Sequence, residues 1–509
     1  MAHDASAPVA GARTSTADMA VLRWLVAATF IVILNETIMI NAIPDLKHHF
    51  HVGNGAAQWL TTAFMLTMAV VIPVTGWFLQ RVTTRQAFGL AMVVFCTGTL
   101  LAASTPPSMF WLLIVARVIQ ATGTAVMMPL LMTTLMNVVP ESDRGRVMGN
   151  VTLAMSVAPA LGPAVSGLIL SSLSWRWMFL LVLPIAGAIG VVGLRKLKNV
   201  GEPTAGAIDV VSVPLAALGF GGLVYGLSLI GRDDAPISPY LLVGGGVVVL
   251  ATFVWRQLSL QREGSPLLDL RTLTHRNYTL SLLLMVIAFM GFLGSMLLMP
   301  LYLQDVRGLS PLRTGLLMMP GGLAMGLLGP RVGKVFDRVG GRPLVIPGAI
   351  GMVIGLGLFT QIDLSTPYAL ILGMHVLLMV SLAAIFTPVF TLGLGAVPQH
   401  LYSHASSLLG ALQQVAGAMG AALSVAVLTA RSGSLAAGGA SQLGAYVGGM
   451  RWAFGLSAVL SIAVVVLAVI LPGRPDGYGH GPAEVDGDVD GELDDIVDGA
   501  VGDATVAAG

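Results

Sequence analysis

The sequence predicts an all-α polytopic membrane protein with 14 transmembrane helices, and three observations lead to this prediction. Apolar stretches of about 20 residues follow one another from Ala20 to Pro472, separated by short polar or glycine-rich loops. The 509 residues are 55% hydrophobic and only 10% charged, whereas roughly 25% of the residues in soluble domains are charged. Lys and Arg are unevenly distributed between alternate loops. Because hydrocarbon offers the backbone no hydrogen-bond partner, each stretch must form an α-helix, and the short alternating strands of a barrel are absent from the sequence.

Each of the fourteen stretches is long enough to cross a bilayer as a helix. We predict spans at residues 20–43, 57–79, 87–105, 109–131, 147–170, 176–194, 208–230, 239–258, 278–302, 312–332, 343–361, 367–390, 404–430 and 450–471. An even number of spans puts both termini on one side of the membrane. If that side is the cytoplasm, the inner segments hold eighteen of the 26 Lys and Arg, and the outer loops hold seven. Since positive residues collect on the cytoplasmic side, we predict a multi-pass protein of the cytoplasmic (inner) membrane with both termini in the cytoplasm.

Two loops on the predicted cytoplasmic side resemble each other: GWFLQRVTTRQ from Gly76 and GKVFDRVGGRP from Gly333. Their separation is too long for a solenoid, but it suits two six-helix bundles of which the second is displaced by one extra helical pair. The predicted organisation is a cytoplasmic segment at 1–19, a first bundle at 20–198, two inserted helices at 199–262, a second bundle at 263–472 and an acidic, disordered cytoplasmic tail at 473–509. Such a duplication with a central cavity is typical of transporters, because a site between the repeats can face each side in turn.

Composition and motifs argue against several other classes of function. The single cysteine, Cys96, lies in a predicted span and the nine His show no HExxH spacing, so we expect neither a disulfide framework nor a metal site. The tail holds ten acids without Lys or Arg over residues 476–509, and Val497 stands where an EF-hand loop needs its last ligand. No GxxxxGK[ST] loop is present, so energy is expected to come from an ion gradient. We expect no enzyme activity, no cofactor and no nucleic-acid partner.

Four motifs resemble those of the major facilitator superfamily, in particular its fourteen-span drug:proton antiporter branch. The second of the two similar loops is close to the superfamily pattern G-x-x-x-D-R-x-G-R-[RK], whereas the first has Gln80 where an acid is usual. The stretch RVIQATG, which contains Arg117, is similar to the fourth-helix motif associated with proton coupling, and APALGPAVSG resembles the fifth-helix antiporter signature. LNETIMINAIP resembles the branch pattern L-D-x-T-[IV]-x-N-x-A-[IL]-P, with Asn35 at the acid position and Glu36 beside it. The resemblance covers roughly residues 20–471.

The resemblance implies a major-facilitator fold and a proton-coupled antiporter that exports drugs or other amphipathic or cationic small molecules by alternating access. It further implies a role in conformational change for Gly76, Arg81, Pro159, Gly162, Pro163, Gly167, Gly333, Asp337, Arg338 and Arg342. The Gly and Pro residues permit close helix approach and a bend. Asp337 with Arg338 and Arg342 is expected to form a charge cluster against helix ends on the cytoplasmic face. The expected partners are a small-molecule substrate, protons and the lipid bilayer, and we expect a monomer.

Glu36 is the candidate protonation site. Placing an ionised carboxylate at the centre of a bilayer costs roughly 2.5–3.5 kcal/mol, and binding a proton relieves most of that cost. Such a group can therefore gain or lose its proton as the site faces one side of the membrane or the other. The alternative is a permanently protonated Glu36 bonded to a neighbouring helix. Arg117 is the only basic residue predicted well inside a span, and it either tunes this carboxyl group or binds backbone carbonyls at a kink. Because consecutive residues are about 100° apart on a helix, either Asn35 or Glu36 faces the cavity.

Further polar residues inside the spans complete the predicted site. The candidates for the substrate cavity are Asn35, Asn41, Gln120, Gln413 and Gln414. We expect structural roles for two others: His375 as a partner of a neighbouring helix, and Asp209 as a cap of the helix that it precedes. An uncoupled facilitator or importer of a specific metabolite remains an alternative function, and uncoupled exchange or accumulation in whole cells would distinguish it from export.

Overall fold

A helix forms at every predicted span. The computed structural model describes residues 16–40, 42–200, 209–231, 237–263 and 266–472, and in these residues it contains no strand. The fourteen long helices are α1 (Thr16–Ile40), α3 (Asn54–Arg81), α4 (Thr84–Ala103), α5 (Phe110–Val138), α6 (Arg144–Ser172), α7 (Arg176–Lys196), α8 (Ser212–Ser228), α9 (Pro239–Glu263), α10 (Arg276–Leu301), α11 (Pro311–Val339), α12 (Arg342–Phe359), α13 (Tyr368–Gly395), α14 (Tyr402–Ala437) and α15 (Gln442–Ile470). The shorter elements are α2 (Ile43–Phe50), η1 (Glu141–Asp143), η2 (Leu270–Thr274), η3 (Tyr302–Val306) and η4 (Gln399–Leu401).

Twelve of the described helices are long and apolar enough to cross a membrane, and among the fourteen long ones α8 and α11 are the exceptions. Helix α8 is apolar but has only 17 residues. Helix α11 has several charged residues in its last turns and many Gly and Pro, which lower its hydropathy. It packs against α6 and α13, so much of its surface faces protein. The all-helical membrane fold is confirmed, whereas the number of fourteen transmembrane helices stays a prediction.

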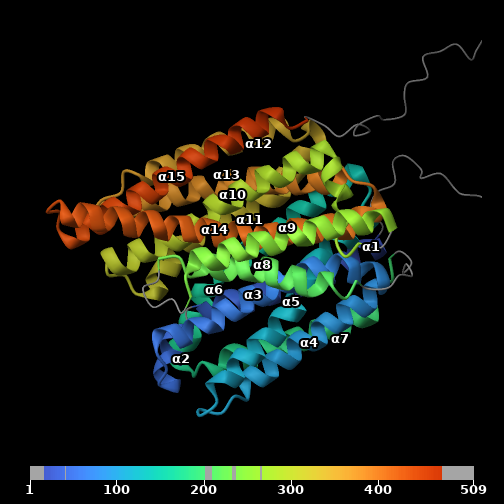
Figure 1. Ribbon diagram of the computed structural model, residues 1–509, viewed down its shortest axis with the longest axis horizontal. Coiled ribbons are helices and arrows are strands. Elements are labelled where there is room, and N and C mark those ends of the chain that lie inside the picture. Colours follow the sequence, from blue (N-terminus) through green and yellow to red (C-terminus); the bar gives the residue numbers. More distant parts are fainter. Residues whose placement is uncertain (1–15, 41, 201–208, 232–236, 264–265, 473–509) are drawn as a thin grey trace, which may run out of the picture. The chain divides into compact units, whose positions relative to one another are not determined.

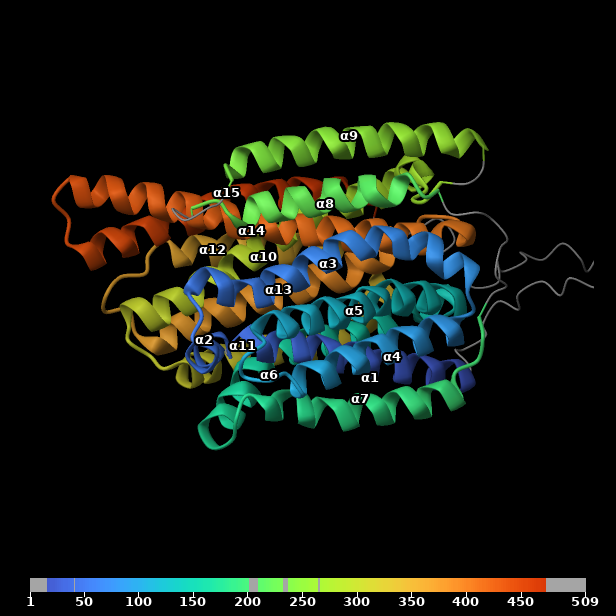
Figure 2. The ribbon, with the colours of Figure 1, turned by 60° about the horizontal axis from the view of Figure 1, so that its bottom comes forward.

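The long helices form two groups and a pair (Figure 1). Helices α1 and α3–α7 pack against one another, and α10–α15 form the second group. The pair α8 and α9 lies beside α3 and α14, with α9 on the outer side of α8 in Figure 2. We call these groups the first bundle, the second bundle and the inserted pair, and the predicted division of the chain into these parts stays a prediction. The boundary residues between these parts also stay predictions.

The two bundles meet along α6 and α11, and along α3 and α14. Glycine permits the first of these contacts. A Cβ atom at Gly149 of α6 would lie 2.3 Å from the carbonyl oxygen of Gly329 on α11, and one at Gly333 would lie 2.0 Å from the carbonyl oxygen of Gly145. Both distances are shorter than any van der Waals contact, so the two backbones touch only because these side chains are missing.

Helix α2 was not among the predicted elements. It is eight residues long, and Asp45 in its first turn and basic residues in its last turn complement the helix dipole. Phe50 at its end packs against Phe110 and Trp175, with ring centroids 5.5 and 5.6 Å apart. Because α2 directly precedes α3, this aromatic cluster closes the first bundle at the end opposite the loop that follows Gly76.

Candidate functional site

Arg117 of α5 is held inside the first bundle by neutral groups, with 1% of its surface exposed. Its Nε donates to the carbonyl oxygen of Leu60 on α3 at 3.3 Å, and its Nη1 donates to Asn35 Oδ1 on α1 at 3.4 Å and to Gln120 Oε1 at 3.1 Å. Its Cζ lies 4.1 Å from the centroid of the Phe64 ring. A buried guanidinium is stabilised by such acceptors and by the face of an aromatic ring. The cation is therefore fixed in place without a carboxylate in direct contact.

The register of α1 separates Asn35 from Glu36. Asn35 is buried and bonded to Arg117, whereas Glu36 is only half-buried and forms no hydrogen bond or direct ion pair with any described residue. The charges of Glu36 and Arg117 still interact at longer range. Gln120 continues the network by donating to Thr99 Oγ1 on α4 at 2.8 Å. Asn35 and Gln120 thus lie in the interior of the first bundle, and Glu36 is the accessible member of the group.

The predicted antiporter signature on α6 packs directly beside this group. A Cβ atom at Gly162 would lie 2.4 Å from Thr37 Oγ1, so the absence of a side chain lets α6 reach α1 one residue after Glu36. The hydroxyl of Thr37 also lies 3.5 Å from the carbonyl oxygen of Ala158, immediately before Pro159.

Other residues of the same signature face the second bundle. A Cβ atom at Gly315 of α11 would lie 2.6 Å from Pro163 Cβ, and one at Gly167 would lie 3.0 Å from Leu312 Cδ1. The signature therefore contacts α1 on one side and α11 on the other. A movement of α11 that displaces α6 changes the packing of α6 against α1 next to Glu36.

Asp337 joins the bundles at the predicted cytoplasmic end, beyond the predicted span of α11. Its Oδ1 and Oδ2 accept hydrogen bonds from the backbone N–H groups of Gly145 and Arg146, both at 2.8 Å. These amides belong to the first turn of α6, where N–H groups lack partners within the helix and the dipole favours an anion. Burial raises the pKa of Asp337 to about 6, and the two amide hydrogen bonds oppose this rise. Arg342 donates instead to the carbonyl oxygen of Val469 near the end of α15, so Asp337 and Arg342 bind the ends of two different helices.

The first copy of the loop makes the equivalent contact through one neutral hydrogen bond, whereas the second copy uses a carboxylate. Gly76 lies against the first turn of α14, as Gly333 lies against that of α6. Four residues further on, where the second copy has Asp337, Gln80 Nε2 donates to the carbonyl oxygen of His400 at 3.0 Å in an exposed position. Arg81 donates to Gln80 Oε1 at 2.8 Å. The duplication is therefore visible in the packing, but only the second copy places an ionisable acceptor on a helix N-terminus of the other bundle.

A set of hydrogen bonds joins the two bundles in the predicted cytoplasmic half. Besides those of Gln80 and Asp337, they link Arg144 with Tyr402 (3.3 Å), Asn137 with Gln399 (2.9 Å), Thr133 and the Pro129 carbonyl with Ser406 (2.9 and 3.5 Å), and Thr152 with Thr387 (2.9 Å). The bundles are thus fastened together at this end. We call this set of contacts the cytoplasmic closure.

The remaining predicted site residues have different surroundings. Gln413 is 8% exposed and its Nε2 has no hydrogen-bond partner, whereas its neighbour Gln414 is half-buried. Asn41 lies outside the described residues. His375 of α13 is buried and bonded to the backbone of Met318 on α11, as expected for a structural role.

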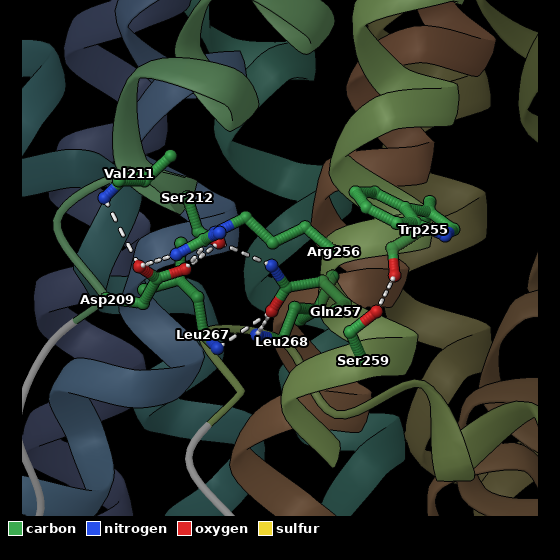
Figure 3. A network of polar contacts seen from close by, with 9 residues as sticks. All are labelled: Asp209, Val211, Ser212, Trp255, Arg256, Gln257, Ser259, Leu267 and Leu268. Atoms are coloured by element: carbon green, nitrogen blue, oxygen red, sulfur yellow. Dashed lines mark hydrogen bonds and ion pairs between the residues drawn. The ribbon is translucent and has the colours of Figure 1, made fainter. Parts of the chain in front are cut away.

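A polar network at the inserted helices includes Asp209 (Figure 3). Its carboxylate accepts two hydrogen bonds from Arg256 of α9, both at 2.7 Å, and one from the amide of Val211 at 3.3 Å. The fully buried Gln257 donates to Ser212 Oγ at 2.6 Å. Its Oε1 accepts from the amides of Leu267 (2.8 Å) and Leu268 (3.1 Å) in the segment leading to α10. Asp209 was predicted to cap α8, but its carboxylate bonds to the amide of Val211, which precedes the helix, and α8 has no side-chain cap at its N-cap residue. The network also ties the inserted pair to the second bundle.

Comparison with known proteins identifies the family. A model of the Major Facilitator Superfamily matches residues 25–421. The lincomycin resistance protein LmrB of Listeria innocua is 37% identical over 406 residues, which cover 79% of this chain and 85% of the relative. The uncharacterized MFS-type transporter YcnB of Bacillus subtilis is 37% identical over 456 residues, covering 89% and 95%.

Solved structures agree in fold. The proton:xylose symporter XylE, bound to 6-bromo-6-deoxy-D-glucose, superposes with a TM-score of 0.61 over 89% of this chain and 96% of that chain, at 16% sequence identity. At this identity the likeness concerns the fold alone. Together with the family match and the helix arrangement, it shows that the chain belongs to the major facilitator superfamily of membrane transporters.

Proposed function

We propose that this chain is a proton-coupled antiporter that exports drugs or other amphipathic small molecules across the cytoplasmic membrane. The observation that carries the proposal is the carboxyl group of Glu36, which is half-buried, has no hydrogen-bond partner among the described residues and interacts with the fixed charge of Arg117. A carboxyl group without a hydrogen-bond partner has no contact to break when it gains or loses a proton. The names of relatives as lincomycin resistance proteins support a drug as the cargo.

Alternating access supplies the coupling in this proposal. The cytoplasmic closure leaves the site to face outward, where a proton binds Glu36 and the drug departs. Gly162 of α6 lies against α1 one residue after Glu36, and Pro163 of the same helix lies against α11. Movement of the second bundle then changes the surroundings of Glu36, and with them its proton affinity. Arg117 keeps a constant charge in both conformations because its partners all belong to the first bundle.

Transport into everted membrane vesicles tests the coupling. The lumen is made acidic, and the membrane potential is held at zero with valinomycin and equal potassium on both sides. We expect the gradient to drive uptake of tetraphenylphosphonium and of chloramphenicol, two probes of different charge. Glu36→Gln is expected to lower the gradient-driven rate at least tenfold, because a carboxamide cannot carry the proton. Asp363→Asn, which removes an acid from an exposed loop, is the matched control and should leave the rate unchanged.

Two results would count against the proposal. Equal uptake with and without the gradient would favour an uncoupled facilitator. Gradient-driven uptake that survives in the Glu36→Gln variant would keep the antiport but remove Glu36 from it.

A further inference from the structure

An unsatisfied amide lies just beyond the cytoplasmic closure. Gln413 is 8% exposed, and its Nε2 has no hydrogen-bond partner in the described structure. Ser406 lies two helical turns earlier on the same face of α14 and bonds to Thr133 of α5 across the bundles. Gln413 therefore lies on the α14 face that points toward the first bundle, on the outer side of the contacts that hold the bundles together. Buried amide donors without partners are uncommon in folded proteins because each loses its bonds to water.

Three phenylalanine rings lie at the same depth. Phe289 and Phe292 of α10 and Phe386 of α13 form a cluster with centroid separations of 5.7, 6.0 and 6.0 Å. The Phe289 ring lies 3.8 Å from a Cβ position at Gly417, one turn beyond Gln413 on α14. Phe386 directly precedes Thr387, which bonds to Thr152 of α6 as part of the cytoplasmic closure. The rings and the amide thus belong to one wall of the second bundle.

One of these rings, that of Phe292, is partly exposed on an inward face. Phe292 is nine residues from Leu283, which places the two side chains on opposite sides of α10. Leu283 is 48% exposed and marks the outer side of the bundle. Phe292 is half-buried although it points the other way and contacts Phe386. Its accessible surface therefore faces the interior between the helices and not the lipid.

The helices of this wall carry no acidic side chain. Helices α10, α13 and α14 contain no Asp or Glu, so none of them supplies a counter-ion for a cationic group. Gln413 offers the wall an N–H donor that has no partner among the described residues. Such a donor recovers its lost hydrogen bond from a carbonyl, hydroxyl or ether oxygen, while the rings stack on an aromatic body.

We propose that Gln413, Phe289, Phe292 and Phe386 form a substrate subsite that binds an uncharged hydrogen-bond acceptor carried on an aromatic body. This inference rests on the proposed export function and names a class of cargo for it. Uncharged, acceptor-bearing aromatic molecules are bound through Gln413, and aromatic cations that lack an acceptor do not use that residue.

Initial rates in the everted vesicles separate the two classes of cargo. Chloramphenicol carries an amide and hydroxyl groups on a neutral aromatic body, whereas tetraphenylphosphonium is an aromatic cation without an acceptor. We expect Gln413→Leu to raise the KM for chloramphenicol about three- to tenfold, the range of one net hydrogen bond, and to leave tetraphenylphosphonium unchanged. Gln413→Glu, which replaces the donor with an acceptor, should weaken chloramphenicol transport at least as much. Gln58→Leu, at an exposed glutamine of α3, is the matched control.

Each outcome decides a different part of the proposal. A parallel loss for both probes, an unchanged KM for chloramphenicol, or transport of tetraphenylphosphonium alone by the unmodified protein would overturn the subsite while leaving export intact. Absence of gradient-driven transport of both probes by the unmodified protein would overturn the export function and the subsite with it.

Discussion

Removal of the Asp337 side chain is expected to open the cytoplasmic end far more than removal of its counterpart Gln80. Both residues follow the duplicated glycine by four positions, and each bonds to a segment of the opposite bundle. Asp337→Ala deprives two first-turn amides of α6, those of Gly145 and Arg146, of their common acceptor. Gln80→Ala removes one neutral hydrogen bond in an exposed position. The comparison therefore isolates the chemistry of the two contacts at matched places in the repeat.

The size of the effect follows from the contacts. Hydrogen bonds to a charged group contribute about 1.5–3 kcal/mol, and an exposed neutral one contributes about 0.5 kcal/mol. Asp337 is half-buried, and its removal also relieves its desolvation, so we expect a net shift of about 2 kcal/mol. That is about a 30-fold change in the open-to-closed ratio, so a protein that is about 99% closed would become about 77% closed. For Gln80→Ala the expected change is about twofold.

Distances between two spin labels measure this ratio. Cysteines at the exposed Ser142 and Val339, in a background where Cys96 is replaced by Ser, place one label on each bundle beside the closure. Double electron–electron resonance at pH 6 should show a second, longer distance in Asp337→Ala and little of it in Gln80→Ala. An unchanged distance distribution in Asp337→Ala, or equal changes in both variants, would refute the reasoning.

Three further predictions concern Asp337, the network at the inserted helices, and the contact between α6 and α11. Burial raises the pKa of Asp337 from 3.8 to about 6, so the closed conformation binds the proton more tightly than one in which the carboxyl group faces water. The closed fraction should therefore rise as the pH falls through about 6 and fall as the pH rises. Asp337→Ala should show no such response in the same spin-label measurement. Gln257→Leu leaves the buried amides of Leu267 and Leu268 without an acceptor, which costs about 1–3 kcal/mol of stability for each amide. Hydrogen exchange at residues 266–272 should therefore be at least tenfold faster. Unchanged exchange would contradict the role of the network. Gly149→Ala places a methyl group against the backbone of α11 and should lower the thermal unfolding temperature by several degrees, as expected for about 1–3 kcal/mol of overpacking; an unchanged temperature would show that α6 and α11 can separate there at no cost.

Most of the fold could be predicted because each membrane helix corresponds to one continuous apolar stretch of the sequence. Each of the fourteen apolar stretches coincides with a helix, since the bilayer leaves no other way to satisfy the backbone. The similar loops at Gly76 and Gly333, from which the duplication was predicted, both pack against a helix start in the opposite bundle. Helix α2 was missed because it is too short to span, and its stability comes from rings of three separate segments that meet around Phe50. Helix α11 shows the limit of hydropathy, because a helix that packs against protein needs small residues more than apolar ones.

The candidate site was predicted only in part. The presence of Glu36 and Arg117 in spans was enough to select them, because ionisable groups are rare there. The sequence could not decide between Asn35 and Glu36, since that choice depends on the rotation of α1 against α5. It also gave no sign that Phe64 and the Leu60 carbonyl hold the guanidinium, because these partners come from another helix.

Two members of the expected charge cluster, Asp337 and Arg342, make separate contacts. Asp337 binds the start of α6 and Arg342 binds the end of α15, although the two residues are only five positions apart. Sequence spacing brings charges near one another, but the helix ends that surround them decide the pairing.

Proton release on substrate binding is the most direct test of the central claim, that Glu36 exchanges a proton for cargo. Purified protein in weakly buffered detergent solution, held near neutral pH, receives tetraphenylphosphonium while a pH indicator records protons. The account predicts release of protons from the unmodified protein and from Asp363→Asn, and none from Glu36→Gln. Equal release from Glu36→Gln, with binding of the probe intact, would contradict it.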